Sequence, residues 1–183
     1  MNNKLVKDAI FGAIGGAAGT FVLDKVMGFL SGYQSKRDKW LERELIREEP
    51  TQALARKAAS SVGIDLGKER KQQLGTAVHW GYGIAWGAIY GVLRNRVGVT
   101  SKAAGVPFGI GFGLFGEGLL LPTFNLTPPA TEFPISSHLV GVAAHCAYAA
   151  TAEAVCSALE AADHALGSSE MPLQTNPELR KAS

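Results

Sequence analysis

The chain has 183 residues, of which 46% are hydrophobic and 19% charged, with 22 glycines and a formal net charge of +2. This composition excludes an intrinsically disordered chain and a disulfide-stapled scaffold, and the weak net charge gives no footprint for a nucleic acid. Cys146 and Cys156 lie ten positions apart on one predicted helix, about 15 Å along its axis, so they form no disulfide with each other. The length suits one compact domain.

In chain order, four apolar runs with almost no Lys or Arg predict helices that cross a membrane, at 8–33, 74–93, 103–121 and 136–159. About 20 apolar residues cover a bilayer core of about 30 Å. The first run also resembles a cleaved signal peptide, but its apolar pattern resumes after Asp24 and Lys25, which favours a span. We therefore predict an all-α fold, a polytopic membrane protein whose four-transmembrane-helix bundle occupies residues 1–166 with Gly and Ala at the helix interfaces.

The polar segment 34–73 connects the first two spans and predicts two short helices. The first, KWLERELIREE, places Trp40 on one face with aliphatic residues, and the second, TQALARKAASSV, starts at a capping Thr51. They either lie on the membrane surface, with Trp40 at headgroup level, or form a solvated hairpin. The link 122–136 holds four prolines, which predicts a stiff extended lid rather than a helix. Residues 167–183 are predicted to form a disordered tail.

Each predicted span carries a ridge of small residues at four-residue spacing, and an ionisable residue interrupts each ridge. Residues four apart lie on one helix face, where small side chains let helix backbones approach closely in lipid. The ionisable residues should therefore face the interior of the bundle. The four ridges are Gly12, Gly16, Thr20, Asp24, Gly28 and Gly32; Gly75, His79, Gly83, Gly87 and Gly91; Gly105, Gly109, Gly113 and Glu117; and Ser137, Gly141, His145, Ala149, Glu153 and Ser157.

Depth along each span brings four of these ionisable residues to a similar level. Counted at about 1.5 Å per residue from the ends beside the polar loop, they lie about 7 to 12 Å deep. His138 lies at the mouth of the fourth span, and Glu153 lies about 24 Å deep, in a second layer near the opposite surface. We predict one polar cluster under the lid, made by Asp24, His79, Glu117, His138 and His145.

Three roles fit such a cluster, because a charge inside a bilayer costs about 2.5 kcal/mol or more and marks a functional site by default. The groups only hold the helices together, or they exchange protons or ions with water, or they bind a divalent metal such as Zn, Fe or Mn. The helix-borne metal motifs HExxH and ExxH are absent. We expect a non-enzymatic membrane role with no catalytic residues, and the alternative is a metal-dependent membrane enzyme or a metal carrier. The expected partners are the lipid bilayer and a second copy or another membrane protein docked on the glycine ridges.

A family resemblance rests on the stretch LPTFNLTPPATEFPISSHLVGVAAHCAYAATAE, on AVHWGYGIAWGAIYG upstream and on VLDKV in the first span. These segments resemble the YagU-like family of small bacterial inner-membrane proteins, whose domain has no known function. The resemblance implies a four-helix bundle in the inner membrane, and one member's link to acid tolerance implies a role in envelope or acid stress. Its most specific pattern is Thr127, Pro128, Pro129, Pro134, His138 and His145, and other matching positions are Asp24, His79, Glu117 and Glu153.

The distribution of basic residues predicts the orientation. The polar loop 34–73 contains ten Lys and Arg residues, whereas five basic residues flank the spans near the other side: Lys4, Lys7, Arg94, Arg96 and Lys102. Because the side richer in Lys and Arg stays in the cytoplasm, we expect the long loop, the lid and the polar cluster on the cytoplasmic side and both termini outside.

Overall fold

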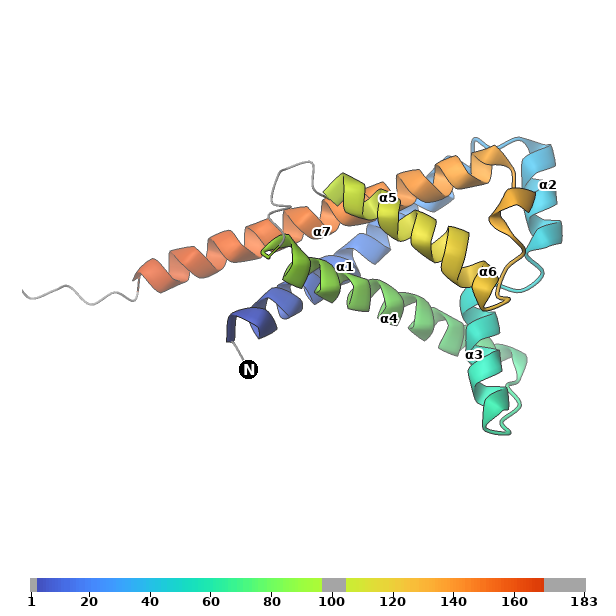
Figure 1. Ribbon diagram of the computed structural model, residues 1–183, viewed down its shortest axis with the longest axis horizontal. Coiled ribbons are helices and arrows are strands. Elements are labelled where there is room, and N and C mark those ends of the chain that lie inside the picture. Colours follow the sequence, from blue (N-terminus) through green and yellow to red (C-terminus); the bar gives the residue numbers. More distant parts are fainter. Residues whose placement is uncertain (1–2, 97–104, 170–183) are drawn as a thin grey trace, which may run out of the picture.

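The computed structural model describes residues 3–96 and 105–169, and every regular element in these residues is helical. The all-α prediction is therefore confirmed for this part of the chain (Figure 1). In order, the elements are α1 (Asn3–Ser31), α2 (Lys36–Leu45), α3 (Pro50–Ser61), α4 (Lys68–Arg94), α5 (Gly105–Phe115), the π-helical turn η1 (Gly116–Leu120), α6 (Leu121–Thr123), the 3-10 turn η2 (Ala130–Glu132) and α7 (Ile135–Ser169).

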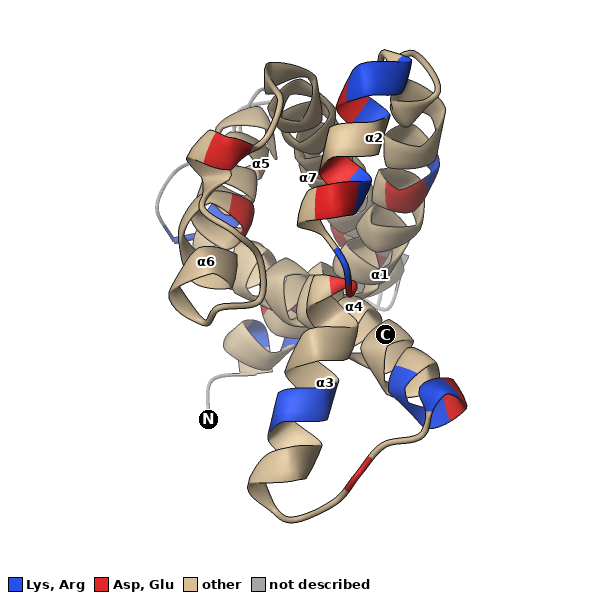
Figure 2. Ribbon diagram, turned by 90° about the vertical axis from the view of Figure 1, so that its right-hand side faces the viewer, with Lys and Arg blue, Asp and Glu red and all other residues tan. Residues whose placement is uncertain are grey.

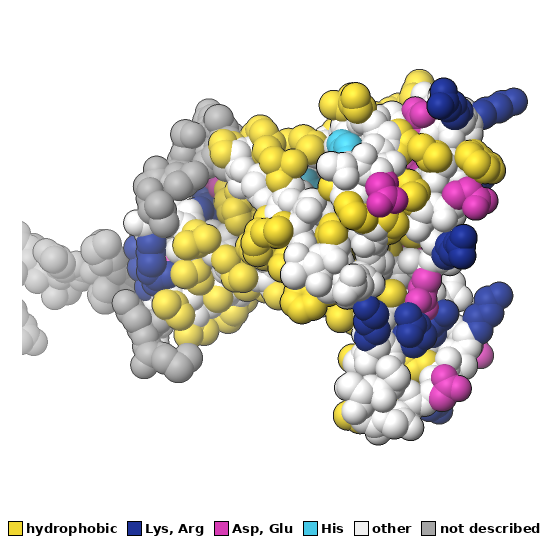
Figure 3. Space-filling view, turned by 45° about the vertical axis from the view of Figure 1, so that its right-hand side comes forward, with side chains coloured by type: hydrophobic (Ala, Val, Ile, Leu, Met, Phe, Trp, Pro, Cys, Tyr) yellow, Lys and Arg dark blue, Asp and Glu magenta, His cyan; other side chains and the backbone are white. Residues whose placement is uncertain are grey.

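Three of the described helical segments are long and apolar enough to cross a membrane: Asn3–Ser31, Gly105–Thr123 and Ile135–Gly167. Their outward residues include large exposed apolar side chains such as Ile14 and Leu139, which suit contact with lipid. Figure 3 shows hydrophobic side chains over the body of the bundle and charged ones gathered at the end that holds α2 and α3. These features are typical of a membrane protein.

Helix α4 has the length of a span but not the same apolarity, because His79 and several Trp and Tyr residues lie along it. It packs along α1, which lies between α4 and α7, while α5 packs on α7 (Figure 1). Consecutive long helices run antiparallel, since early residues of α1 meet late residues of both α4 and α7.

Two glycine faces let α1 occupy this central position. A Cβ atom on Gly16 would lie 2.8 Å from the Cα atom of Gly87 in α4, and one on Gly15 would lie 2.9 Å from the carbonyl oxygen of Ala152 in α7. Both distances are shorter than real side chains allow, so only glycine permits these backbone approaches. Neighbouring glycines of one helix therefore serve two different partners. The ridge that contains Gly16 was expected from the sequence, whereas the face of Gly15 was not.

Aromatic rings fill the space between α4 and α5. Trp86 of α4 contacts Phe112 of α5 with ring centroids 5.1 Å apart, and Tyr90 contacts Phe108 at 4.7 Å. Phe112 also packs against Tyr148 of α7, whose hydroxyl crosses the bundle to donate a hydrogen bond to the Gly83 oxygen at 2.5 Å. Glycine contacts join α1 to α4, α1 to α7 and α5 to α7, whereas large aromatic rings fill the interface between α4 and α5.

The polar connection forms two helices at one end of the bundle. Figure 2 looks at this end and shows α2 beside the ends of α1 and α7, with α3 below. Glu48, between the two helices, pairs with Arg56 of α3 at 3.0 Å and with Lys71 of α4 at 2.9 Å. Gln52 of α3 lies against Gly75 of α4. These contacts attach α3 to the start of α4.

The lid and the C-terminal segment differ from the sequence expectation. The link 122–136 is not extended throughout, because α6 continues the third helix to Thr123 and a 3-10 turn forms at Ala130–Glu132. Pro122 is the second residue of α6, directly after the π-helical turn, and the helical segment continues through it to Thr123. Helix α7 continues to Ser169, three residues into the predicted tail, and residues 170–183 lie outside the described chain.

Candidate functional site

Asp24 of α1 and His79 of α4, two members of the predicted polar cluster, are in contact. The Asp24 Oδ1 atom lies 2.9 Å from the His79 Nε2 atom, within hydrogen-bonding distance. Their side chains are 46% and 36% exposed, although both belong to long helices whose other outward residues are largely apolar. The pair is therefore open to the surroundings at a level where the chain otherwise presents apolar surface.

The position of this pair follows from an antiparallel ladder between α1 and α4. Gly12 lies against Gly91, Gly16 against Gly87, and Thr20 against Gly83, so the partners step by four residues in opposite directions. The next step brings Asp24 to His79. One step further the helices have separated, because a Cβ atom on Gly28 would meet nothing within 4 Å. The imidazole and the carboxylate thus occupy the last rung before α1 and α4 diverge.

Glu117 and His145 form a second pair between α5 and α7. The Glu117 Oε1 atom lies 3.8 Å from His145 Nδ1, which is an electrostatic contact rather than a hydrogen bond. His145 Nδ1 donates instead to the Gly141 carbonyl oxygen at 2.8 Å, so Nδ1 carries the proton in this arrangement. The missing side chain of Gly141 leaves room for the Glu117 carboxylate. The ring of Phe112 packs on the imidazole at 4.9 Å.

Glu117 lies in the π-helical turn η1, which interrupts an otherwise continuous helix from Gly105 to Thr123. π-Helical turns are rare and occur often at functional sites, because the wider turn changes the direction of its side chains. The four-residue spacing of Gly105, Gly109, Gly113 and Glu117 identifies Glu117 in the sequence. It cannot locate the wider turn, because the chain is α-helical both before and after η1.

His138 and the lid residues lie at the loop end of the bundle. The His138 Nε2 atom donates to the Ala130 carbonyl oxygen at 2.9 Å, which ties the start of α7 to the 3-10 turn of the lid. Pro134 precedes α7, and its carbonyl oxygen accepts a hydrogen bond from the Ser137 N–H at 3.0 Å. A pocket of about 450 Å³ lies between the lid and the α2–α3 connection, with walls that include Thr127, Pro128, Pro129, Arg47, Glu48 and Arg56.

The structure brings the predicted groups together as two pairs, each within one pair of helices. Tyr82 and Phe112 lie in contact, and Phe112 touches His145, so aromatic rings extend from the Glu117–His145 pair toward α4. Among residues 3–96 and 105–169, no three His, Cys, Asp or Glu side chains gather closely enough to hold a metal ion. The metal hypothesis therefore gains no ligand set from the described chain.

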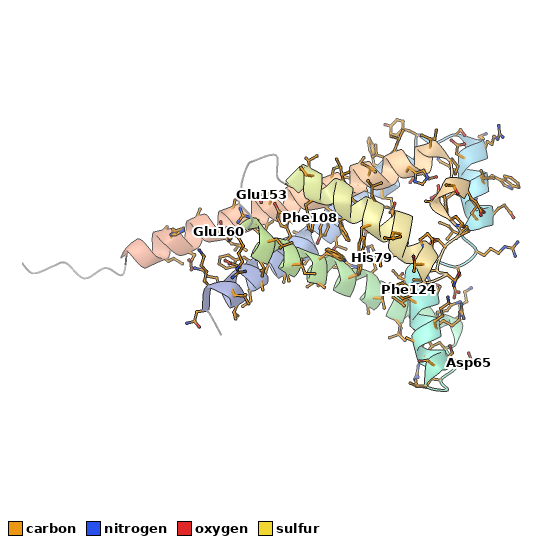
Figure 4. All side chains as sticks on the ribbon, in the orientation of Figure 1. Asp65, His79, Phe108, Phe124, Glu153 and Glu160 are labelled. Atoms are coloured by element: carbon orange, nitrogen blue, oxygen red, sulfur yellow. The ribbon has the colours of Figure 1, made fainter. Side chains whose placement is uncertain are left out.

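Glu153, predicted as a second layer, belongs to a buried ionic centre around Arg94. Arg94 is 5% exposed. Its guanidinium donates hydrogen bonds to Glu153 at 2.5 and 2.9 Å and to Ser157 at 2.9 Å, and it forms an ion pair with Glu160 at 2.7 Å. The Tyr90 hydroxyl donates to Glu153 as well. Figure 4 shows Glu153 and Glu160 toward the opposite end of the bundle from His79. The sequence pattern predicts Arg94 only as a basic residue that flanks a span, and it gives no sign of this buried position.

Asp8 and Asn95 continue the α1–α4 ladder into this centre. The Asn95 side-chain amide donates to Asp8 Oδ1 at 3.2 Å and to Glu160 at 2.8 Å. Asp8 is 3% exposed, and its other oxygen has no hydrogen-bond partner within the described part of the chain. Both residues lie at the four-residue spacing of the two ridges, which is the sequence signal that identifies them.

The fold and the paired sites define a class: a helical, membrane-type bundle with carboxylate–imidazole pairs between its long helices. More specifically, the chain belongs to the family described as "Protein of unknown function (DUF1440)", whose model matches residues 51–154. The matched region contains His79, Glu117, His145 and Glu153 but ends short of Asp24 on the N-terminal side. No curated protein and no solved structure matched the chain.

Proposed function

We propose that the chain is an integral membrane protein of four spanning helices that transfers protons across the membrane by way of its two carboxylate–imidazole pairs. The observation that carries this proposal is the 2.9 Å contact between Asp24 and His79, both partly exposed on membrane-length helices. Ionisable side chains at such depth are costly in lipid and are found facing water-filled spaces or one another. We infer that water reaches this partly exposed pair, because an ionisable pair that faces lipid would be costly.

The chemistry of the pairs supports proton exchange. Imidazole titrates nearest to neutral pH of all side chains, and a carboxylate beside it accepts or stabilises the proton. His79 uses Nε2 toward Asp24, whereas His145 uses Nδ1 toward a backbone oxygen and lies 3.8 Å from Glu117. The Asp24–His79 pair is thus hydrogen-bonded, whereas the Glu117–His145 pair is close but not hydrogen-bonded.

The proposal includes the membrane arrangement. Helix α4 becomes the fourth span because its outward residues are apolar, among them Leu74, Ile84, Ile89 and Leu93. We place the protein in the bacterial inner membrane with the loop 34–73 in the cytoplasm, on the basis of its ten basic residues. Proton uptake at the loop side would then serve the cell when acid enters the cytoplasm, consistent with a role in acid or envelope stress.

Proton flux into vesicles tests the proposal directly. Purified full-length protein is reconstituted in liposomes that hold a pH-sensitive dye, and a potassium diffusion potential drives proton entry. We expect wild-type protein to acidify the interior faster than empty liposomes do. Asp24→Asn and Glu117→Gln, which keep side-chain shape but remove the charge, should each slow this acidification by about a hundredfold or more, the loss typical of removing a proton-transfer group.

Asp65→Asn provides the matched control. It makes the same chemical change as Asp24→Asn, but Asp65 is exposed in the connection between α3 and α4 (Figure 4). This variant should carry protons as wild type does. If wild-type liposomes acidify no faster than empty ones, the proton role is wrong. A lower melting temperature in Asp24→Asn without any flux in wild type would mean that the pair only holds α1 against α4.

A further inference from the structure

Two of the three acidic residues of α2, Asp38 and Glu42, face the bundle. The Ser136 hydroxyl donates to Asp38 at 2.8 Å, and the Ser137 hydroxyl donates to Glu42 at 3.0 Å, so both carboxylates lie at the start of α7. Gln34 also donates to Glu42 at 3.2 Å. Negative charge at a helix N-terminus is favourable, which stabilises this arrangement. The acidic side of α2 is therefore used inside the protein.

The opposite side of α2 is basic and exposed. We name the exposed residues Lys36, Arg37, Trp40, Arg43 and Glu44 the basic face of α2. Three cations on this face outnumber the single carboxylate, and Trp40 lies among them with 55% of its surface exposed. A count along the sequence hides this segregation, because the acidic residues alternate with the basic ones.

Exposed apolar side chains place the basic face at the edge of the membrane. Phe29 and Tyr33, at the end of α1, are 65% and 77% exposed and pack against each other with ring centroids 5.2 Å apart. Ile135 and Leu139, at the start of α7, are 77% and 65% exposed. Both helices have the length and apolarity of spans, and aromatic side chains concentrate where spans meet the headgroups. Helix α2 joins these two helix ends and lies at that level.

We propose that the basic face of α2 binds the headgroups of anionic phospholipids in the leaflet around the loop end. The phosphate charge complements Lys36, Arg37 and Arg43, and Trp40 inserts among the headgroups, as in amphipathic interfacial helices. A pocket of about 460 Å³ between the end of α1 and α2, lined in part by Arg43 of this face, adds Lys39 to the basic surface, and its acidic lining is Glu42 and Glu49. The inference rests on the membrane insertion proposed above and is independent of proton exchange.

Quenching of Trp40 by brominated lipids tests the inference. In the full-length chain, Trp80→Phe and Trp86→Phe leave Trp40 as the single tryptophan. The protein is placed in nanodiscs of phosphatidylcholine and phosphatidylglycerol in which one lipid or the other is brominated near the glycerol. At equal mole fraction we expect the brominated phosphatidylglycerol to quench Trp40 about twofold more strongly or better, and about 0.5 M salt to abolish the difference.

Charge substitutions identify the residues responsible. The triple variant Lys36→Gln, Arg37→Gln and Arg43→Gln should quench equally with both lipids. Lys68→Gln, Arg70→Gln and Arg96→Gln together remove the same charge from exposed positions of α4 and the turn after it, and this control should keep the preference. Equal quenching of wild-type Trp40 by the two lipids, or no quenching by either, would overturn the inference.

A second single-tryptophan protein separates this outcome from a failure of membrane insertion. Trp40→Phe and Trp80→Phe leave Trp86, which lies in the aromatic layer between α4 and α5. Lipid brominated deep in the acyl chains should quench Trp86 if the bundle spans the membrane. Quenched Trp86 with unquenched Trp40 overturns only the α2 site, whereas an unquenched Trp86 overturns the insertion on which it rests.

Discussion

Gly87 lies where the backbones of α4 and α1 touch, so a single methyl group should separate them. A Cβ atom at this position would lie 2.7 Å from the Gly16 nitrogen, against backbone that cannot rotate away. We expect Gly87→Ala to lower the free energy of unfolding by about 1 to 3 kcal/mol, the usual cost of overpacking. Thermal unfolding in detergent, followed by circular dichroism, measures this.

Gly81→Ala is the control for helix propensity, because a Cβ atom on Gly81 of the same helix meets nothing within 4 Å. Alanine favours a helix over glycine by up to about 1 kcal/mol, so this variant should melt at the wild-type temperature or above it. Equal melting of the two alanine variants would show that α1 and α4 are not in backbone contact.

Arg94 neutralises a buried carboxylate centre, so its removal should destabilise the bundle strongly. Its side chain is 6% exposed and pairs with Glu153, which is 14% exposed. Arg94→Gln leaves these acids without a cation and should cost about 3 to 5 kcal/mol, whereas exposed Arg96→Gln should cost little. The double variant Arg94→Gln and Glu153→Gln should recover part of the loss. Chemical unfolding of wild type, Arg94→Gln, Glu153→Gln and the double variant measures the coupling, and strictly additive losses would exclude it.

The sequence predicts the rungs of the α1–α4 ladder well, because the same four-residue spacing defines a helix face and a helix contact. The ladder also includes Asp8 and Asn95. Both lie at the polar ends of their helices, at the edge of or outside the apolar runs by which the spans are delimited in the sequence. Gly15 escapes for another reason: a second glycine face becomes meaningful only when the neighbouring helix is known. Similar depth predicted one cluster, yet depth leaves the position around the bundle open, and Asp24 and Glu117 contact different histidines.

At the scale of elements, α3 depends on Glu48 for part of its attachment to α4. Hydrogen bonds from Arg56 and then Lys71 lower the pKa of the Glu48 carboxyl below its ordinary value of 4.5. A pKa that is lower in the folded protein adds stability above the unfolded value, and this contribution disappears as the pH falls through the folded value. Wild type should therefore exceed Glu48→Gln in stability at pH 7 by up to about 1 kcal/mol, the scale of surface pairs.

Melting temperatures at a series of pH values test this dependence. The difference between wild type and Glu48→Gln should hold above about pH 4.5 and disappear as the pH then falls through the lower pKa of folded Glu48, because a protonated Glu48 resembles glutamine. Glu69→Gln, an exposed change in the first turn of α4, serves as the control. A wild-type advantage that persists in acid would mean that the Glu48 charge is not what holds α3.

The lid and the third helix mark where element prediction ends. Prolines predicted an extended lid, but the helical segment that begins at Gly105 continues through Pro122 to Thr123. Lys57 of α3 then donates to the carbonyl oxygens of Phe124 and Asn125 at 2.8 and 3.0 Å, and this long-range contact holds the turn in which Asn125 adopts a positive φ of 51°. A local pattern carries no information on such a partner 67 residues away in the chain.

At the scale of the whole molecule, the number of membrane crossings decides where the chain ends lie. Helix α4 follows α1 rung by rung through Gly83, Gly87 and Gly91, and its 27 residues span about 40 Å, enough for a bilayer. If α1 crosses the membrane as proposed, an antiparallel partner in contact with it over this length should cross too. Four crossings place both chain ends on one side of the membrane and the loop 34–73 on the other, whereas three crossings separate the two ends.

Reporter fusions distinguish the two arrangements. A phosphatase active only outside the cytoplasm is fused before Met1, inserted at Gly63 or fused after Ser183; Gly63 suits insertion because it lies in an exposed turn with nothing near its Cβ position. We expect activity from both terminal fusions and none from Gly63, because the ten basic residues of the loop hold it in the cytoplasm. Opposite results at the two ends would remove α4 from the membrane, and with it the shared depth of Asp24 and His79.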